Sequence, residues 1–333
     1  MGKEKLVFVD HIFHTKSRSG DFLREIFKKH YEIIDVWIDK NLKFSKKIYE
    51  NKNIFFFQIF PPLSVLNKLK GKNLMWAPMY DSPHYPIGFS PLIWKIVELY
   101  NLKILSFSRK ITNQIKDLKI KYLDLRFFIK PKKIRKIKKS KVDIFFWYRG
   151  FIDIDDWINI INFKNINKIT YFDTEPKRKI PTLLKHKKIN YLKSNFLRNK
   201  KNFISLIQKS DIFICSRKKE GIGMAQVEAL SMGKYLIGYD EATMSDYIKN
   251  LKIGFLFNQK KKNSFILKNV HKYKNYRLKY ADKGYQKFEK DKKKIIQLFK
   301  KNTNKEVKFI KFLSILLLVK IYTLKRKIFM LSI

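Results

Sequence analysis

The sequence is poor in cysteine, glycine and proline. The single Cys215 excludes a disulfide framework and a cysteine-based zinc site, and it fits a reducing, cytosolic setting. With 11 glycines and 9 prolines in 333 residues, a collagen-like chain is excluded as well. A hydrophobic fraction of 45% and an aromatic fraction of 15% exclude wholesale disorder. What remains is a globular chain long enough for two domains with separate cores.

Acidic residues are also scarce, with 28 against 74 basic ones, a formal net charge of +46. One interpretation is a polyanionic partner, such as a nucleic acid, an acidic membrane surface or a diphosphate-bearing substrate. The other is the bias of AT-rich coding toward Lys, Ile, Asn, Phe and Tyr. Because basic blocks are usually solvated surface, we give the second interpretation more weight for the bulk of the lysines.

No apolar run reaches the roughly 20 residues that span a bilayer. The first one, Leu6–Val9, is too short for a secretory signal, and the longest, Phe309–Val319, carries Lys311. We therefore expect a cytoplasmic protein. The basic, apolar segment 307–333 could place it on the inner face of an anionic membrane. A helix that packs back on the protein, or a frayed end, is the alternative.

Short apolar runs alternate with amphipathic stretches in both halves of the chain. This alternation is typical of α/β folds with a doubly wound parallel sheet. The strands expected from such runs are 6–9, 54–59, 73–79 and 103–107 in the first half, and 142–147, 169–172, 211–216 and 235–239 in the second. The expected helices are 21–29, a stretch after Pro61-Pro62, 91–100, a helix centred on 157–161, a helix ending at 206–210, 224–231, 245–249 and a lysine-rich region at 263–301.

A lysine-rich stretch, KPKKIRKIKKSK, separates the two halves and predicts an exposed connection. The expected organisation is a first domain at 1–130, a basic linker at 131–141 and a second domain at 142–262. A C-terminal helical region at 263–302 and a basic, apolar tail at 303–333 follow.

The segment Asp211–Ile248 carries the chemistry. A strand ends at Ser216-Arg217, a glycine-flanked turn follows, and a helix begins near Met224. Such a turn lets backbone N–H groups approach an anion at the helix amino terminus. Glu220 lies in the turn and Glu228 about one helical turn inside the helix, so their carboxylates can address different ends of one extended ligand.

Several of these residues resemble a known family. Glu220-Gly221-Ile222-Gly223, then Glu228-Ala229-Leu230 and Gly233, is similar to the signature of retaining GT-B glycosyltransferases of the family 4 (glycosyltransferase group 1) type. The strand end Trp147-Tyr148-Arg149-Gly150 resembles the element that opens that family's C-terminal domain. The resemblance implies two Rossmann-like doubly wound domains facing a central cleft, with an acceptor-binding domain at 1–130 and a nucleotide-sugar donor-binding domain at 142–262.

The resemblance also implies roles for individual residues. Glu220 would bind hydroxyls of the donor sugar, Glu228 the ribose, and Arg149 the departing diphosphate. The remaining donor-binding candidates are Gly221, Gly223, Ser216, Arg217, Thr243 and Met244. The chain departs from the family pattern at Phe151–Trp157, which is acidic where the family places a second cation.

Two further groups of polar residues are candidates for other roles. Asp153 and Asp155 form a D-x-D pattern that could bind a metal in a GT-A enzyme, but an acid-rich helix start is the preferred interpretation. His11 (with Asp10 and His14) and Asp81 with His84 follow expected strands of the first half. They are candidates for the acceptor side, and turn residues satisfied by local backbone are the alternative.

The sequence therefore predicts a glycosyltransferase that uses a nucleoside-diphosphate sugar and a saccharide or lipid-linked saccharide acceptor, with retention of anomeric configuration. The expected setting is surface polysaccharide or lipopolysaccharide synthesis, with no metal or other cofactor and no nucleic-acid partner. The alternative is a non-catalytic GT-B-like protein that binds nucleic acid or another polyanion through its basic surface.

Overall fold

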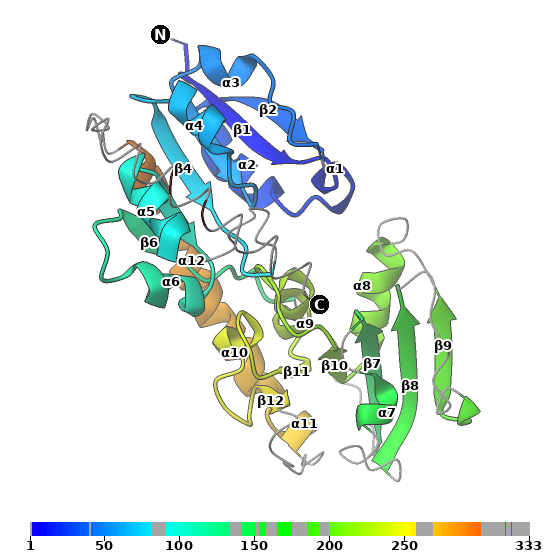
Figure 1. The fold of residues 1–333 in the computed structure, drawn as a ribbon. Helices are drawn as coiled ribbons and strands as arrows, with labels where there is room; N and C mark the ends of the chain where they lie inside the picture. Colours follow the sequence, from blue (N-terminus) through cyan, green and yellow to red (C-terminus); the bar gives the residue numbers. More distant parts are fainter. Residues whose placement is uncertain are drawn as a thin grey trace. The chain divides into compact units, whose positions relative to one another are not determined.

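The computed structural model describes residues 2–39, 41–81, 91–132, 141–150, 153–157, 165–174, 185–193, 200–257 and 269–300, with Leu317 and Ile321. The chain divides into two compact units (Figure 1). Unit 1 comprises Met1–Leu125 and Lys290–Ile333, and unit 2 comprises Arg126–Glu289. Each unit is an α/β structure built on one parallel sheet, so the α/β two-domain fold predicted from the sequence is confirmed.

The sheet of unit 1 has six strands in the order β2-β1-β3-β4-β5-β6, and every neighbouring pair is parallel. The strands are β1 (Lys5–His11), β2 (Glu32–Ile38), β3 (Asn53–Phe57), β4 (Asn73–Ala77), β5 (Lys103–Ser106) and β6 (Tyr122–Asp124). The helices between them are α1 (His14–Ser17), α2 (Asp21–Lys28), α3 (Lys47–Glu50), α4 (Leu63–Lys68), α5 (Pro91–Leu99) and α6 (Arg109–Ile115).

The central strands of unit 1 are the ones that the apolar runs predicted. Leu6–Val9 of β1 are fully buried, as expected for a parallel strand covered on both faces. The two strands missed from the sequence, β2 and β6, lie at the edges of the sheet, and most of their residues are exposed or half-buried. Asp35 interrupts the apolar run of β2, and β6 spans only three residues, so a search for continuous apolar runs could not reveal either strand.

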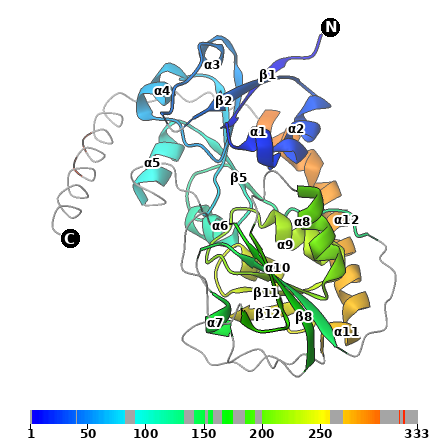
Figure 2. The ribbon, with the colours of Figure 1, turned by 90° about the vertical axis from the view of Figure 1, so that its right-hand side faces the viewer.

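The sheet of unit 2 also has six parallel strands, in the order β12-β11-β10-β7-β8-β9. They are β7 (Val142–Tyr148), β8 (Ile166–Asp173), β9 (Ile189–Lys193), β10 (Ile212–Cys215), β11 (Tyr235–Tyr239) and β12 (Gly254–Phe257). The helices are α7 (Ile154–Trp157), α8 (Lys200–Lys209), α9 (Met224–Ser231), α10 (Met244–Tyr247) and α11 (Asn269–Lys272). Figure 2 shows α8 and α9 side by side.

Counted within the unit, this order is that of the dinucleotide-binding sheets. The predicted α9 and β11 are confirmed to the residue, and the strands at 142–147, 169–172 and 211–216 are found with small shifts. The helix expected at 157–161 overlaps α7 only at Trp157, and residues 158–164 lie outside the described part. The two strands missed from the sequence, β9 and β12, form the edges.

The last long helix, α12 (Lys274–Lys300), begins in unit 2 and ends in unit 1. In unit 2, Arg277 is 1% exposed and donates hydrogen bonds to the carbonyl oxygens of Gly233, Lys252 and Val270. In unit 1, the Phe299 ring packs on Phe27 and Tyr31.

This division differs from the contiguous domains that the sequence suggested. The first unit ends at Leu125 rather than near residue 130, and residues 290–333 return to it. The physical reason is the pair of anchors on α12, one in each unit, which no local sequence pattern encodes. Within the expected linker, the backbone N–H of Lys132 donates to Ser231 O at 2.9 Å. Residues 133–140 of that linker lie outside the described part of the chain.

Candidate functional site

The carboxyl ends of β7 and β10 form the natural ligand position in unit 2. These strands are neighbours in the sheet, and the chain continues from them to opposite sides, which makes this the topological switch point. Arg149 follows β7 and Ser216 follows β10. The Arg149 N–H donates to Ser216 Oγ at 2.8 Å, and Ser216 is fully buried. Ser216 thus joins the two strand ends.

Glu220 brings two arginines together at this switch point. Its Oε1 lies 3.5 Å from Arg149 Nη1 and 3.7 Å from Arg217 Nη1. Oε1 is buried and accepts no hydrogen bond within the described residues. The Arg149 guanidinium also lies over the Trp147 ring, 4.4 Å from its centroid. The cluster is charged but loosely satisfied, so hydroxyls and anionic oxygens of a ligand can add to it.

The only cysteine of the chain lies directly before this cluster. Burial, and next the negative charge of Glu220, raise the pKa of the Cys215 thiol to about 12. The nucleophilic form of cysteine is the thiolate, which a pKa this high suppresses near neutral pH. Cys215 is therefore a packing residue at the end of β10.

The glycine turn before α9 has the geometry that the sequence suggested. Gly223 has φ +69° and forms the N-cap of α9, which has no side-chain hydrogen bond at its cap. A helix amino end of this kind attracts anions through its N–H groups and its dipole. Gln226 is 3% exposed, and neither amide atom has a hydrogen-bond partner within the described residues. Sequence patterns gave no signal for Gln226.

Three of the predicted donor residues take different positions in unit 2. Thr243 is fully buried, and its Oγ1 lies 2.8 Å from the carbonyl oxygens of both Glu220 and Gly221. Met244 is also fully buried, with its Sδ 3.2 Å from an ideal Cβ position on Gly238 of β11. Glu228 lies on α9 with a partly exposed side chain. The Thr243 hydroxyl therefore supports the turn, whereas Met244 packs against β11.

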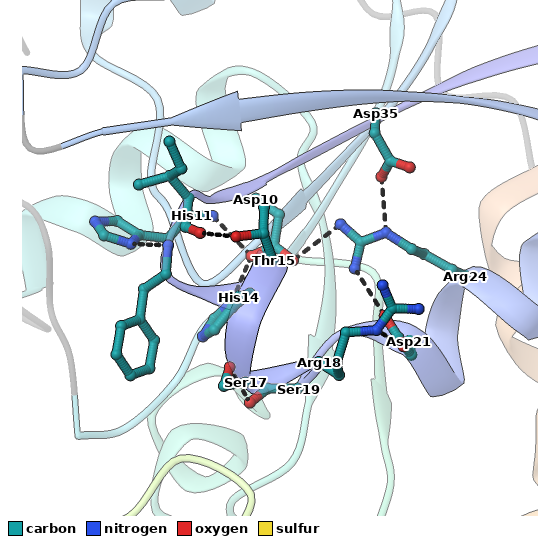
Figure 3. Close-up of polar contacts among 12 residues, drawn as sticks. Asp10, His11, His14, Thr15, Ser17, Arg18, Ser19, Asp21, Arg24 and Asp35 are labelled. Carbon is teal, nitrogen blue, oxygen red and sulfur yellow. Dashed lines mark hydrogen bonds and ion pairs between the residues drawn. The ribbon is translucent and has the colours of Figure 1, made fainter. Parts of the chain in front are cut away.

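One group of the acceptor-side candidates, His11 with Asp10 and His14, forms a second polar cluster in unit 1 (Figure 3). Asp10 at the end of β1 contacts His11 through its backbone N–H, His14 and Arg24. The sequence pointed to Asp10, His11 and His14 together but gave no signal for Arg24, which reaches the cluster from α2. Asp81 lies in the loop that follows β4 and is partly exposed. His84 lies outside the described residues.

Asp153 has a local structural role. Its Oδ1 accepts hydrogen bonds from Ile154 N at 2.6 Å and from Tyr171 Oη at 2.8 Å. Within the described ranges, no group of three or more His, Cys, Asp or Glu residues could hold a metal ion. The helices of that part of the chain include none that is long and apolar enough to cross a membrane.

Known proteins resemble both this segment and the whole chain. Residues 177–282 match the family model described as Glycosyl transferases group 1. They contain Glu220, Glu228 and the glycine turn between them. No curated protein sequence matches the chain.

Several solved structures have the same fold. A glycosyltransferase from Rickettsia africae ESF-5 is 12% identical with a TM-score of 0.57, covering 91% of this chain and 100% of that one. WaaG, a glycosyltransferase involved in lipopolysaccharide biosynthesis, is 12% identical with a TM-score of 0.55, covering 89% and 100%. HepE from Anabaena, in complex with UDP and glucose, is 10% identical with a TM-score of 0.55, covering 90% and 100%. The chain thus has the two-domain fold of the GT-B glycosyltransferases, and its residues 177–282 are similar to the glycosyl transferases group 1 domain.

Proposed function

We propose that the protein transfers a glycosyl group from a nucleoside-diphosphate sugar to a saccharide or lipid-linked saccharide, with retention of anomeric configuration. The observation that carries this proposal is the Arg149–Glu220–Arg217 cluster beside the uncapped amino end of α9. The matched group 1 domain and the glycosyltransferases that share the fold support the same reaction class. The lipopolysaccharide role of WaaG supports a surface polysaccharide or lipopolysaccharide setting.

In this proposal each residue acts through its position. The α9 amino end and Arg149 hold the diphosphate, whose negative charge grows as the glycosidic bond breaks. Glu220 accepts hydrogen bonds from the donor sugar and Glu228 from the ribose. The acceptor oxygen bonds to the anomeric carbon, the bond to the diphosphate breaks, and the hydroxyl proton passes to the released diphosphate. No protein nucleophile and no metal are part of this scheme.

A titration with nucleoside diphosphates at low and high salt tests the proposal. We expect saturable binding that is lost in Glu228→Ala and kept in Glu98→Ala, a matched substitution of an exposed acid on α5. A screen of nucleotide-sugar donors for hydrolysis and transfer then identifies the donor, and the anomer of the product reports retention. Equal binding by both variants, or an inverted product, contradicts the corresponding part of the proposal.

The alternative of a polyanion-binding protein rests on the net charge of +46. It predicts binding of short nucleic acids that weakens steeply as salt rises, because binding releases counterions. It also predicts no turnover of any nucleotide sugar. Membrane contact through 307–333 is a separate proposal, tested by sedimentation with anionic vesicles.

A further inference from the structure

A loop and the start of a helix expose apolar side chains on unit 2. Loop 249–253 leads into β12, beside α11 and the start of α12 (Figure 1), and its Leu251 is 55% exposed. Tyr276, in the first turn of α12, is 40% exposed. Within the part of unit 2 that the structure describes, no other large apolar side chain is as exposed. Asn250 links the loop to the helix, since its Nδ2 donates to Tyr276 Oη at 3.4 Å.

Arg277 holds the loop and the helix start together. Its side chain is buried and donates hydrogen bonds to the carbonyl oxygens of Lys252 in the loop, at 3.1 Å, and of Val270 in α11. Within the loop, the Lys252 N–H donates to Asn250 Oδ1 at 3.0 Å. A buried charge with several backbone partners orders the segments that it joins. The exposed side chains therefore project from a rigid base.

The charge around the exposed apolar side chains has one sign. Lys252 lies in the loop, and Lys272 and Lys279 are exposed on α11 and α12. The sequence has no acidic residue from 247 to 281. The amino end of α12 adds the positive end of its helix dipole, and no acid lies in its first turn. Cations at this end of a helix are unfavourable unless an anion lies nearby, so the surface is complementary to an anionic partner.

The positions of the lysines favour one kind of anionic partner. Lys252 Nζ lies over the Tyr273 and Tyr276 rings, 5.6 and 5.3 Å from their centroids, and Lys272 Nζ lies 5.4 Å from the Tyr273 centroid. Single-stranded nucleic acids stack their bases on open aromatic faces, whereas these rings already contact ammonium groups. An anionic bilayer uses all parts of this surface, because leucine and tyrosine enter its interface and lysines attract its lipid phosphates.

We infer that this surface of unit 2 docks the protein on an anionic lipid bilayer. Leu251 and Tyr276 enter the boundary between headgroups and acyl chains, and Lys252, Lys272 and Lys279 bind lipid phosphates. The loop lies at the amino end of β12, whereas the candidate donor site lies at the carboxyl ends of β7 and β10 in the same parallel sheet. Docking therefore leaves that site open. The contact is separate from the proposed reaction and from segment 307–333.

A polarity-sensitive thiol probe at position 251 tests the docking on the full chain. Cys215 is the only native cysteine, and burial raises its pKa to about 12, so the thiol of Leu251→Cys can be labelled selectively. With vesicles of equal parts phosphatidylglycerol and phosphatidylcholine, the probe emission should shift to shorter wavelength. The control is Leu118→Cys, at an exposed leucine of unit 1, which should show no shift.

The probe also separates this contact from the tail. If residues 307–333 alone carried the chain to the vesicles, the emission at position 251 would stay unchanged, and the inference would be overturned. An equal shift at Leu118→Cys would overturn it as well, because the contact would then not be specific to this surface.

Removal of charge measures the electrostatic part of the docking, by titrating the same probe with lipid. The combined substitutions Lys252→Gln, Lys272→Gln and Lys279→Gln should weaken vesicle binding about a hundredfold, because each lysine at an anionic surface contributes about fivefold. The matched control replaces three exposed lysines of unit 1 by glutamine: Lys43, Lys46 and Lys47. Equal losses in the two triple variants would assign the binding to the net charge of +46 and overturn the inference.

Two further measurements exclude effects on folding and on nucleic-acid binding. The thermal midpoint and nucleoside-diphosphate binding should be the same in the wild type and in both triple variants, because the substituted lysines lie outside the donor site and the core. Short single-stranded DNA should bind the wild type and the Lys252–Lys272–Lys279 variant equally. If that variant lost DNA binding and kept vesicle binding, the surface would be a nucleic-acid site and the inference would be overturned.

Discussion

Each unit places an acid near the carboxyl end of a strand at its switch point, but the two acids have different surroundings. In unit 1, Asp10 is fully buried and both of its oxygens have partners within 3.0 Å. In unit 2, Glu220 is contacted by two arginines no closer than 3.5 Å, and its buried Oε1 accepts no hydrogen bond within the described residues. A closed network stabilises the fold and fixes its neighbours, whereas an open cluster retains capacity for a ligand.

The largest expected effect is on stability, and it comes from the closed network around Asp10. Asp10→Ala leaves Arg24 buried without its fully buried carboxylate partner, so we expect the free energy of unfolding to fall by about 3–5 kcal/mol. Denaturant unfolding measures this loss. Asp35→Ala is the control, because Asp35 also binds Arg24 but is 36% exposed. A loss of no more than about 1 kcal/mol is expected there. Equal losses in the two variants would remove the distinction between the closed and open acids.

In the open cluster around Glu220, the substitution Glu220→Gln should reduce activity and leave stability nearly unchanged. Removing one electrostatic contact at a reacting centre typically lowers kcat by about 10²–10³-fold. The thermal midpoint should stay close to that of the wild type, because no hydrogen bond to Glu220 Oε1 is lost within the described structure. Donor turnover and a melting curve on the same sample measure both quantities. A large drop in melting temperature would assign Glu220 a structural role like that of Asp10.

The glycine turn permits a matched pair of substitutions. Gly223 has φ +69° and Gly71 has φ +76°, so alanine at either position should cost about 1–2 kcal/mol of folding free energy. An added Cβ on Gly71 meets nothing within 4 Å, which makes Gly71→Ala the control for backbone strain alone. We expect nucleoside-diphosphate affinity to fall about tenfold in Gly223→Ala. Isothermal titration should find it unchanged in Gly71→Ala, and equal affinities in both variants would argue against the turn as the diphosphate site.

The smallest expected effect is on the pH dependence of stability, and it comes from a buried lysine of unit 1. Lys103 is 1% exposed, and its Nζ donates to Asn73 Oδ1 at 2.6 Å and to Phe299 O at 2.7 Å. Burial, and next the charge of Lys121, lower the pKa of Lys103 from 10.5 to about 8. The unfolded chain therefore binds more protons than the folded one between these two pH values. Linkage then requires stability to rise with pH from about 8 to 10.5.

The pH dependence of Lys103→Met isolates this contribution. Other groups also titrate in that window, so the informative quantity is the difference between the wild-type and variant slopes of unfolding free energy against pH. The wild-type slope should be the steeper. Parallel slopes would show that Lys103 titrates as it does in water.

Local sequence was sufficient to predict the strand, turn and helix that bear the candidate site. It was not sufficient to predict the side-chain contacts within that site. The run DIFICS predicted β10 because a strand covered on both faces is continuously apolar. The spacing of Glu220, Gly223 and Glu228 predicted the turn and α9, since a glycine with positive φ before a helix is a local property. Thr243 and Met244 came from the family resemblance rather than from local sequence, and only the fold shows that both side chains are fully buried.

Which residues approach one another was decided by the tertiary structure. Arg149 meets Glu220, and Arg24 meets Asp10, only because parallel strands and their helices bring distant segments to one sheet edge. Residues 290–300 of α12 join unit 1 through Phe299 and Lys103, although they are contiguous in sequence with unit 2. Sequence alone determined the parallel α/β units and the glycine turn, because backbone conformation and apolar patterning act over a few residues. The ion pairs, and the packing of the end of α12 on unit 1, depend on contacts between residues far apart in the sequence. They could therefore be seen only in the tertiary structure.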